Sequence, residues 1–209
     1  MVTGPAAGPE EVGLHEADMA PTWLEMFRRW YGDAGAADPE RDAMSLATSD
    51  GHGRPAVRIV LLKAVDERGF SFYTNLRSRK AADLDTRPVA ALAWHWARTE
   101  RQVRATGAVT PLSPEESDAY FATRQRRSQL GAWASPQSQV LGSRQELEAR
   151  LAEVEARYDG RPVPRPPWWG GLCLSPFHVE FWQGRANRLH DRLRYRADGG
   201  VWVLERLAP

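Results

Sequence analysis

The sequence predicts a mainly β protein of the α+β class, a small antiparallel barrel with peripheral helices. Segments with the two-residue period of strands come in short runs, and tight turns such as Asp50-Gly51-His52-Gly53 separate them. Only a few helical segments interrupt these runs. A doubly wound parallel sheet would need a regular alternation of strands and helices, which the sequence does not show.

The length and composition fit a single domain. The chain has 209 residues, of which 42% are hydrophobic, and shows no internal repeat. Its 28 Lys+Arg and 27 Asp+Glu leave a net charge of +1, so no overall field favours nucleic acid or an anionic membrane. The apolar runs are too short to span a bilayer, and no secretory signal is recognisable. The single cysteine, Cys173, excludes an internal disulfide. We expect a cytoplasmic protein.

The first half of the chain predicts one long helix, one short helix and most of the strands. Residues 1–21 mix Gly, Pro, Ala and Glu without periodicity, which predicts a disordered arm before a domain at 22–209. Apolar residues at helical spacing predict an amphipathic helix from 22 to about 31. A short helix follows Ser78 and stops before Pro88. The predicted strands are 44–48, 56–65, 69–74, 89–96 and 101–110.

The second half predicts helices first and a closing hairpin last. Ser113-Pro114-Glu115-Glu116 is a capping box with proline at the first helical position, and Ser143 to Glu146 repeats the box before a helix to about Tyr158. Residues 161–167 form a proline-rich extended connector. Strands are predicted at 172–182, 189–196 and 201–206, the last two joined across Asp198-Gly199-Gly200.

Two cationic segments point to a bound anion. Arg79 and Lys80 follow the predicted cap Ser78, where the positive end of a helix disfavours cations unless an anion lies there. The apolar strand 58–63 carries Arg58 and Lys63 at its ends, where burial of the strand would desolvate both. Lys63 and Lys80 are the only lysines among the 28 basic residues. The alternative is that these are solvated surface cations.

Two further groups of polar side chains share a predicted face. Tyr120, Arg124 and Ser128 follow each other at intervals of four, so one helix continuing through Arg127 would align them as a grip for a phosphate. The alternative is a solvated helix end. Beyond Trp182, the alternating residues of one strand would present Arg188, His190 and Arg192 to an anion or an aromatic ring.

The chemistry of these groups is binding rather than nucleophilic attack. The sequence has no Gly-x-Ser-x-Gly elbow, no Gly-x-Gly-x-x-Gly dinucleotide fingerprint and no Gly-x-x-x-x-Gly-Lys-Ser/Thr loop for nucleotide phosphates. Its one cysteine and five scattered histidines offer no convincing set of ligands, so we expect no metal site.

Taken together, these segments make the sequence resemble the pyridoxine/pyridoxamine 5′-phosphate oxidase family over roughly residues 22–209. The segments that carry the resemblance occur in the family's order. They are Arg58-Ile-Val-Leu-Leu-Lys63, Phe72-Tyr-Thr-Asn75, Ser78-Arg-Lys80, Glu100-Arg-Gln102-Val, Ser128-Gln-Leu-Gly-Ala-Trp133, Gln137-Ser138, Trp169-Gly-Gly171, Glu180-Phe-Trp-Gln-Gly184, Arg188-Leu-His-Asp-Arg192 and Arg206-Leu-Ala-Pro209.

The resemblance implies a split β-barrel homodimer that binds FMN at the subunit interface. By motif matching, the FMN contacts would be Arg58, Ile59, Val60, Leu61, Leu62, Lys63, Tyr73, Thr74, Arg79, Lys80, Gln102, Gln137, Ser138, Trp182 and Arg192. Arg79 and Lys80 would take the FMN phosphate. The substrate phosphate would fall to Lys63, Tyr120, Arg124 and Ser128. Arg188 and His190 would act as the catalytic pair, covering the substrate ring opposite the flavin.

The implied reaction is oxidation of pyridoxine or pyridoxamine 5′-phosphate to pyridoxal 5′-phosphate, with O₂ reduced to hydrogen peroxide. Three other functions stay open: a flavin oxidase of the same scaffold acting on a secondary metabolite such as a dihydrophenazine, a non-catalytic flavin or pyridoxal phosphate binding protein, and a nicotinamide-dependent flavin reductase. Many family members carry an Arg-Arg-x-Tyr element near the N-terminus that folds over the substrate. Residues 1–21 contain neither arginine nor tyrosine, so that element is absent or replaced.

Overall fold

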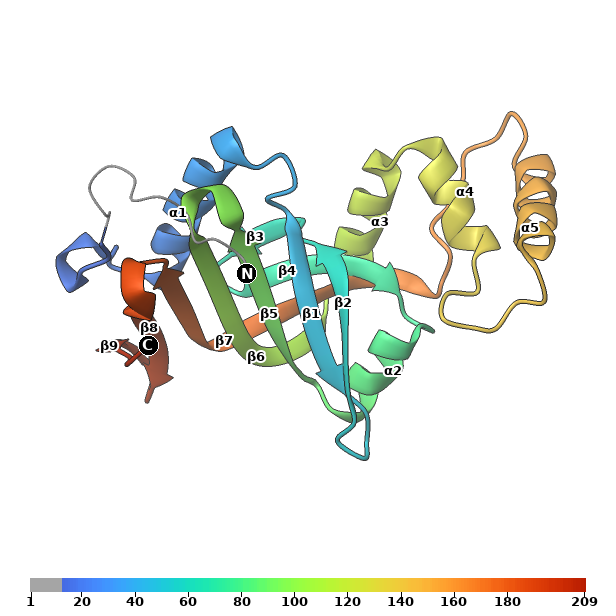
Figure 1. Ribbon diagram of the computed structural model, residues 1–209. Coiled ribbons are helices and arrows are strands. Elements are labelled where there is room, and N and C mark those ends of the chain that lie inside the picture. The colour runs from blue at the N-terminus through green and yellow to red at the C-terminus, as the bar shows by residue number, and fades with distance from the viewer. Residues whose placement is uncertain (1–12) are drawn as a thin grey trace, which may run out of the picture.

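Residues 13–209, which the computed structural model describes, contain nine antiparallel strands joined in one curled sheet (Figure 1). The strands are β1 (Ala43–Ser49), β2 (Pro55–Leu61), β3 (Ala64–Asp66), β4 (Gly69–Asn75), β5 (Val89–Trp96), β6 (Arg101–Pro111), β7 (Trp169–Gln183), β8 (Asp191–Asp198) and β9 (Val201–Arg206). Their spatial order is β2-β1-β5-β6-β7-β4-β3, and the β8–β9 hairpin is added to β7. The expected split antiparallel barrel is confirmed.

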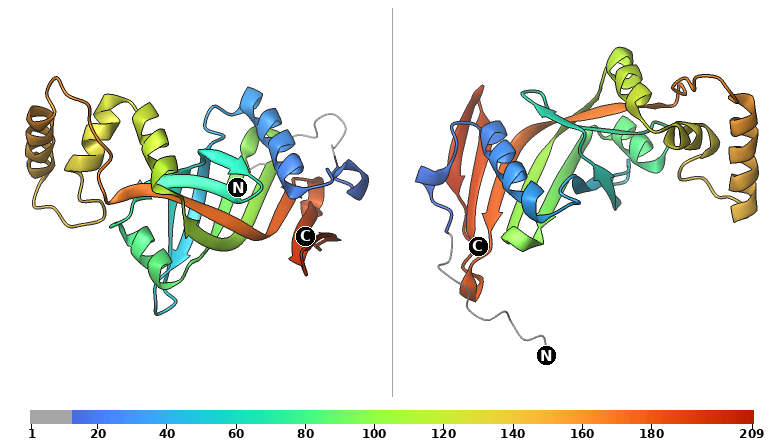
Figure 2. Two further views of the ribbon diagram at one scale, coloured as in Figure 1. Left: turned by 180° about the vertical axis from the view of Figure 1, so that it is seen from behind. Right: turned by 90° about the horizontal axis from the view of Figure 1, so that it is seen from above.

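The helices lie outside the sheet. They are α1 (Trp23–Ala37), α2 (Arg79–Thr86), α3 (Pro114–Thr123), α4 (Arg126–Ala134) and α5 (Arg144–Arg157), with short 3₁₀ turns at Glu16–Asp18, Ala97–Thr99 and Ala186–Arg188. In both views of Figure 2, α3, α4 and α5 gather at one end of the molecule, and the β8–β9 hairpin lies at the other. Within 13–209 no helix is both long and apolar enough to cross a bilayer.

Strand β7 is the central strand of the sheet, because it pairs with three neighbouring strands. It hydrogen-bonds to β6 along nearly its whole length, to β4 through its first half and to β8 through its second half. The register with β6 shifts between Thr106 and Gly107, which leaves Phe177 as an extra residue in β7. A bulge of this kind bends a strand and increases its twist. A Cβ on Gly107 would lie 2.0 Å from the Ser175 carbonyl oxygen, so only glycine permits this close approach.

Helix α1 packs its aromatic side chains against the inner face of the sheet. The Thr22 hydroxyl accepts a hydrogen bond from the Glu25 N–H (3.2 Å) and starts the helix. Its apolar face is buried, with Phe27 fully covered and Trp30 2% exposed. Phe27 packs edge-on against Phe70 (4.9 Å between centroids), so the aromatic rings of α1 contact the inner face of the sheet. Burying each such side chain contributes roughly 1.5–3 kcal/mol. The amphipathic helix predicted here is confirmed, although it continues to Ala37.

Two predicted elements are interrupted. The predicted strand 56–65 is wrong as one strand, because the chain turns between β2 and β3. There the Leu62 N–H donates to the Asp42 carbonyl (2.9 Å) and the Lys63 N–H to the Ser71 carbonyl (2.9 Å). The helix predicted to continue through Arg127 is also wrong. Arg124 has an extended backbone (φ −72°, ψ 145°), so α3 ends at Thr123 and α4 begins only at Arg126.

The strand predicted to align Arg188, His190 and Arg192 begins only at Asp191. Asn187 and Arg188 before it have left-handed backbones, with φ of 58° and 62°. The common face proposed for the three side chains is therefore wrong, since the alternation of a strand does not apply before Asp191.

The N-terminal arm was predicted to be disordered over residues 1–21, and residues 1–12 lie outside the described part of the chain. The rest of that prediction is wrong, because residues 13–21 pack against the C-terminal hairpin. Leu14 and Ala20 are buried, and the Ala20 carbonyl accepts a hydrogen bond from the Tyr195 hydroxyl. The partners that order this segment lie more than 170 residues away, so no local pattern could reveal them.

Candidate active site

A cavity of about 830 Å³ opens between the barrel and the helices α3 and α4. Its size suits a small-molecule or cofactor site. Eleven of the predicted site residues line it: Ile59, Val60, Leu61, Lys63, Tyr73, Thr74, Lys80, Tyr120, Arg124, Ser128 and Gln137. Six further lining residues were not predicted: Asn75, Gln125, Gly131, Ala132, Ser135 and Trp169. Four of them, Asn75, Gly131, Ala132 and Trp169, fall inside segments that carry the family resemblance, so a signal for these four is present in the sequence.

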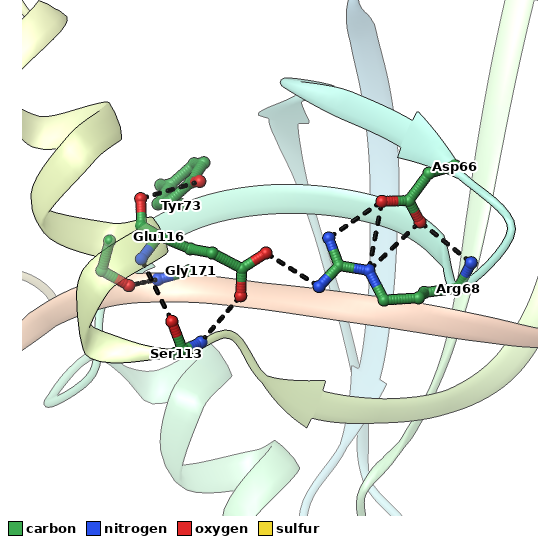
Figure 3. Close-up of polar contacts among 7 residues, drawn as sticks. Asp66, Arg68, Tyr73, Ser113, Glu116 and Gly171 are labelled. Atoms are coloured by element: carbon green, nitrogen blue, oxygen red, sulfur yellow. Dashed lines mark hydrogen bonds and ion pairs between the residues drawn. The ribbon is translucent and has the colours of Figure 1, made fainter.

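Helix α3, which leads to Tyr120 and Arg124, is fixed to the barrel at its N-terminus (Figure 3). The predicted capping box is confirmed: the Ser113 hydroxyl accepts from the Glu116 N–H (3.1 Å), and the Glu116 carboxylate accepts from the Ser113 N–H (3.0 Å). That carboxylate also accepts from Arg68 Nη1 (2.8 Å), beyond the β3 strand. The Ser117 hydroxyl accepts from the Gly171 N–H of β7 (3.1 Å). These hydrogen bonds fix the position of α3 relative to β3 and β7.

One wall of the cavity is a stack of aromatic rings. Tyr73 of β4 lies 4.0 Å from Tyr120 of α3, with 15° between the ring planes. Trp169 of β7 stacks on the same group, 5.4 Å from Tyr73 and 11° from its plane. A Cβ on Gly171 would come within 2.7 Å of Tyr73 Cε1, so glycine leaves the room that the tyrosine needs. Burial raises the pKa of the Tyr73 phenol, which therefore stays protonated.

Arg124 faces this wall with an unused donor. Its guanidinium lies 4.7 Å from the Trp169 ring, and its Nη1 is buried without a hydrogen-bond partner in residues 13–209. Burial lowers the pKa of Arg124, although the Tyr120 phenol opposes that shift. A buried guanidinium without a partner is costly, and an anionic ligand would satisfy it.

Lys80 forms a second cationic centre, on the first turn of α2. Its ammonium donates to Gln137 Oε1 (2.7 Å), Ser78 Oγ (3.0 Å) and Thr74 Oγ1 (3.1 Å), three neutral acceptors. Ser78 was predicted to cap α2, but its side chain makes no capping bond and instead accepts from Lys80. Burial, followed by the charge of Arg58, lowers the pKa of Lys80 to about 8.

The charge of the cavity is of one sign. Lys63, Lys80 and Arg124 line it, and within residues 13–209 no aspartate or glutamate does. The Lys63 side chain is exposed and makes no hydrogen bond or ion pair within 13–209. Arg124 belongs to the aromatic wall, whereas Lys80 belongs to the group of Thr74, Ser78 and Gln137. The cavity thus offers two cationic centres on different elements, which suits two anionic groups.

Four predicted cofactor residues lie beside the cavity rather than in its wall. Arg58 is committed to the barrel: its Nη1 donates to Thr48 Oγ1 (2.7 Å), and its Nη2 lies 3.7 Å from the buried carboxylate of Asp83. Leu62 is part of the core, 5% exposed. Arg79 and Ser138 are exposed and outside the lining set, and Ser138 has a left-handed backbone with φ of 72°.

The remaining predicted residues form a second group on β6, β7 and β8. Gln102, Trp182 and Arg192 are register neighbours on three adjacent strands. The residues that follow them in these strands, among them Val103 and Leu193, are buried in the core, so the row of three lies on the outer face. Arg192 is held by Glu180, with Nε to Oε1 at 2.9 Å and Nη2 to Oε2 at 3.2 Å.

His190 joins this second group, 4.6 Å from the Trp182 ring. Its Nδ1 accepts a hydrogen bond from the Arg185 N–H (3.0 Å), so the neutral ring carries its proton on Nε2 and presents it as a donor. Arg188 is exposed and makes no side-chain hydrogen bond or ion pair within the described chain.

The two groups lie far apart in one chain. Trp169 in the cavity and Trp182 in the second group are thirteen residues apart on the same strand. At about 3.3 Å per residue, roughly 40 Å of β7 separates them along the strand. Figure 1 shows this strand running from the helices α3 and α4 to the β8–β9 hairpin. Both groups can contact one ligand only if the second group comes from another copy of the chain.

The fold and this cavity define a split-barrel protein built to hold aromatic, anionic ligands. Residues 36–158 match the family model described as pyridoxamine 5′-phosphate oxidase, and residues 169–209 match the pyridoxine 5′-phosphate oxidase C-terminal dimerisation region. The chain therefore belongs to the pyridoxine/pyridoxamine 5′-phosphate oxidase family. The expected family and class of enzyme, an oxidase, are confirmed.

Individual relatives agree with this assignment. The pyridoxine/pyridoxamine 5′-phosphate oxidase of Rubrobacter xylanophilus is 54% identical over 198 residues, which is 94% of this chain and 91% of that one. The enzyme of the same name from Thermosynechococcus vestitus is 56% identical over 197 residues, covering 94% of this chain and 93% of its own.

Among solved structures, PhzG from Burkholderia lata in complex with tetrahydrophenazine-1-carboxylic acid superposes with a TM-score of 0.90 at 34% identity, covering 97% of this chain and all of that one. A pyridoxamine 5′-phosphate oxidase-related, FMN-binding protein from Nostoc punctiforme gives a TM-score of 0.72 at 20% identity, covering 91% of this chain and all of that one. The second likeness supports the fold alone.

Proposed function

We propose that the protein oxidises pyridoxine 5′-phosphate or pyridoxamine 5′-phosphate to pyridoxal 5′-phosphate, using FMN as cofactor and O₂ as acceptor. The observation that carries this proposal is the pair of cationic centres in one cavity without carboxylates, Lys80 on one element and Arg124 on another. FMN and the substrate each bring one phosphate. The aromatic wall beside Arg124 suits flat rings.

The residues around Lys80 fit the phosphate of FMN. Lys80 is a compact ammonium held by neutral partners, and the first N–H groups of α2 carry no side-chain cap. A helix N-terminus with a buried ammonium is a strong anion site. Arg79, on the same turn and exposed, is free to close over the phosphate. The ring of FMN would lie along the β2 residues Ile59 and Leu61, which line the cavity.

The residues around Arg124 fit the phosphate of the substrate. The unpaired Nη1 of Arg124, the exposed ammonium of Lys63 and the hydroxyls of Tyr120 and Ser128 all lie in the cavity wall. The predicted alignment on one helix was wrong, but the break after α3 still leaves all of them in one cavity. Donors from three elements hold a phosphate in a fixed place, so they also fix the ring attached to it.

We further propose a homodimer in which the second group of one subunit completes the cavity of the other. Gln102, Trp182 and Arg192 would contact the flavin, and Arg188 and His190 would cover the substrate ring. Strand β2 supports such an association, because it lies at the edge of the sheet and exposes Val57 (69%) next to the cavity-lining Ile59 and Leu61. An apolar edge strand left in water is unfavourable, whereas a partner subunit would cover it.

The protein's own part in the reaction is placement. FMN, when bound, would supply the acceptor for the hydride that leaves C4′ and pass the electrons to O₂, giving hydrogen peroxide, and with the amine substrate water would then release ammonia and supply the aldehyde oxygen. Lys63 and Arg124 hold the substrate by its phosphate. His190 offers its Nε2–H to a ring substituent, because Nδ1 is already occupied by the Arg185 N–H.

Anaerobic mixing tests the proposal. The purified protein is expected to be yellow, and either phosphorylated B6 vitamer is expected to bleach its visible absorption before oxygen is admitted. Unphosphorylated pyridoxine serves as the matched control, since it lacks the group that Arg124 and Lys63 bind. If the flavin stays oxidised with both phosphorylated vitamers, the proposed substrate is wrong.

A second candidate function is oxidation of a reduced phenazine, favoured by the 0.90 superposition on PhzG. A dihydrophenazine carboxylate carries no phosphate, so it would leave part of the cationic group around Arg124 unused. A parallel arm of the mixing experiment with this compound decides between the two. Faster bleaching by the phenazine than by either phosphorylated vitamer would favour the second function.

A further inference from the structure

The loop that presents Arg188 and His190 has a backbone that needs support. Asn187 and Arg188 are consecutive non-glycine residues in the left-handed region, with φ of 58° and 62°. Asparagine tolerates this conformation, but arginine rarely adopts it. Such residues keep their conformation only where surrounding contacts hold them.

Asp191, the residue after His190, is the centre of those contacts. Its Oδ2 accepts a hydrogen bond from the Leu14 N–H (3.0 Å) and lies 3.7 Å from Arg185 Nη1, at the start of the loop. Its Oδ1 accepts from Arg206 Nη1 (2.8 Å), near the end of the chain. One carboxylate thus ties both ends of the loop to residues that are remote in sequence.

Arg206 closes the connection to the N-terminal segment. Its Nε and Nη2 donate to the two oxygens of Glu16 (2.8 and 2.9 Å), and Nη2 also donates to the Leu14 carbonyl (3.0 Å). Leu14 itself is buried, 4% exposed, and anchors the segment. The hydrogen bonds from Arg206 hold the pKa of Glu16 at about 2, so this carboxylate is charged throughout the range in which the enzyme would work.

We propose that Leu14, Glu16, Asp191 and Arg206 form a clasp that positions the loop 185–190, and so sets the orientation of Arg188 and His190 toward the substrate. The clasp rests on the proposed function for its effect on the reaction, whereas its effect on the loop does not. Glu16 and Arg206 are positioning residues, since neither lies in the cavity nor in the row of Gln102, Trp182 and Arg192.

A local role follows from how exposed the clasp is. The side chains of Glu16 and Arg206 are 57% and 38% exposed. Ion pairs of this exposure contribute little to global stability. Their loss is therefore expected to release the loop without unfolding the barrel, since loops open at lower free energy than core strands.

Hydrogen–deuterium exchange on the full-length holoenzyme tests the clasp, with Glu16→Gln and Arg206→Lys as variants. Exchange in a peptide covering 184–190 is expected to rise about twofold to fivefold, the range that a surface ion pair can supply, while a peptide covering 43–49 stays unchanged. Glu16→Asp should restore most of the protection. Glu148→Gln is the matched control, because it removes an equally exposed carboxylate from a surface pair with Arg144 (2.8 Å) on α5.

Steady-state kinetics with pyridoxine 5′-phosphate supply the second readout. Glu16→Gln is expected to lower kcat by a factor similar to the rise in exchange and to leave KM and FMN affinity unchanged, because the two cationic centres lie on other elements. Unchanged exchange in 184–190 overturns the clasp, and faster exchange with an unchanged kcat overturns its positioning role. If the wild-type enzyme does not oxidise the substrate at all, the proposed function fails, and the exchange data alone still decide whether the clasp holds the loop.

Discussion

FMN affinity should depend on pH through Lys80. In the free protein, burial lowers the pKa of Lys80 to about 8, whereas a phosphate dianion bound to the ammonium would keep it protonated well above that value. Binding then requires a protonated Lys80. The fraction of protein that meets this requirement is about nine-tenths at pH 7 and about one-tenth at pH 9.

The expected effect is a dissociation constant for FMN that rises about tenfold between pH 7 and pH 9, equivalent to about 1.4 kcal/mol. Fluorescence titration of the apoprotein with FMN measures it, because flavin emission changes on binding. Lys80→Met should bind FMN more weakly at pH 7 and should lose most of the pH dependence.

Riboflavin, which lacks the phosphate, is the control ligand. Its affinity should be insensitive both to pH over this range and to the Lys80→Met change. A wild-type affinity for FMN that is flat between pH 7 and pH 9, or an equal slope in Lys80→Met, would refute the assignment of Lys80 to the phosphate.

The lowered pKa of Lys80 should also make the stability of the free protein depend on pH. The pKa of Lys80 is lower in the folded than in the unfolded protein, so the free energy of unfolding should rise between pH 8 and about 10.5, by up to roughly 3 kcal/mol. Chemical denaturation of the apoprotein should show this rise, and denaturation of Lys80→Met should not. Arg124→Gln should raise KM for the phosphorylated substrate about tenfold to a hundredfold, the worth of a hydrogen bond to a charged group, with FMN occupancy unchanged by absorbance; equal losses of both would mean that the two anion sites are interchanged. Asp83→Ala should lower the free energy of unfolding by about 3 kcal/mol in urea titrations, because it leaves Arg58 without its carboxylate; a change below about 1 kcal/mol would show that Arg58 is solvated.

Local patterns were sufficient where local physics decides the structure. Strand β5 occupies the predicted residues 89–96, because the order of its residues matches the alternating burial of a strand. The capping box at Ser113 formed as predicted, since all of its partners lie within four residues. At Ser143 only half of the box forms: the hydroxyl accepts from the Glu146 N–H, but the Glu146 carboxylate accepts from the Gly142 N–H.

Predictions failed where a contact made elsewhere in the fold, or a local break in the backbone, decided the structure. The extended backbone of Arg124 ends α3, which the spacing of Tyr120, Arg124 and Ser128 does not reveal. Residues 13–21 are ordered by partners such as Asp191 and Arg206 at the far end of the chain. The periodicity of the sequence reveals neither the end of α3 nor the packing of residues 13–21.

The candidate site divides in the same way. The motifs named most of the cavity lining, and the predicted strand 172–182 ends at Trp182, but it starts after Trp169 and so does not show that β7 joins the two groups of site residues. Motifs in the sequence show which residues belong to the site. That these residues lie at two ends of the molecule becomes clear only from the course of β7 in the structure.

Strand β7 has a consequence for genetics as well as for structure. In the proposed homodimer each active centre draws Lys80 from one subunit and Trp182 from the other, so two different lesions need not fall in the same centre. Co-refolding Lys80→Met with Trp182→Ala would give mixed dimers in which one centre inherits both lesions and the other inherits none. Random pairing makes half of the dimers mixed, so the mixture should gain about a quarter of wild-type activity above the residual activity of the two variants measured alone.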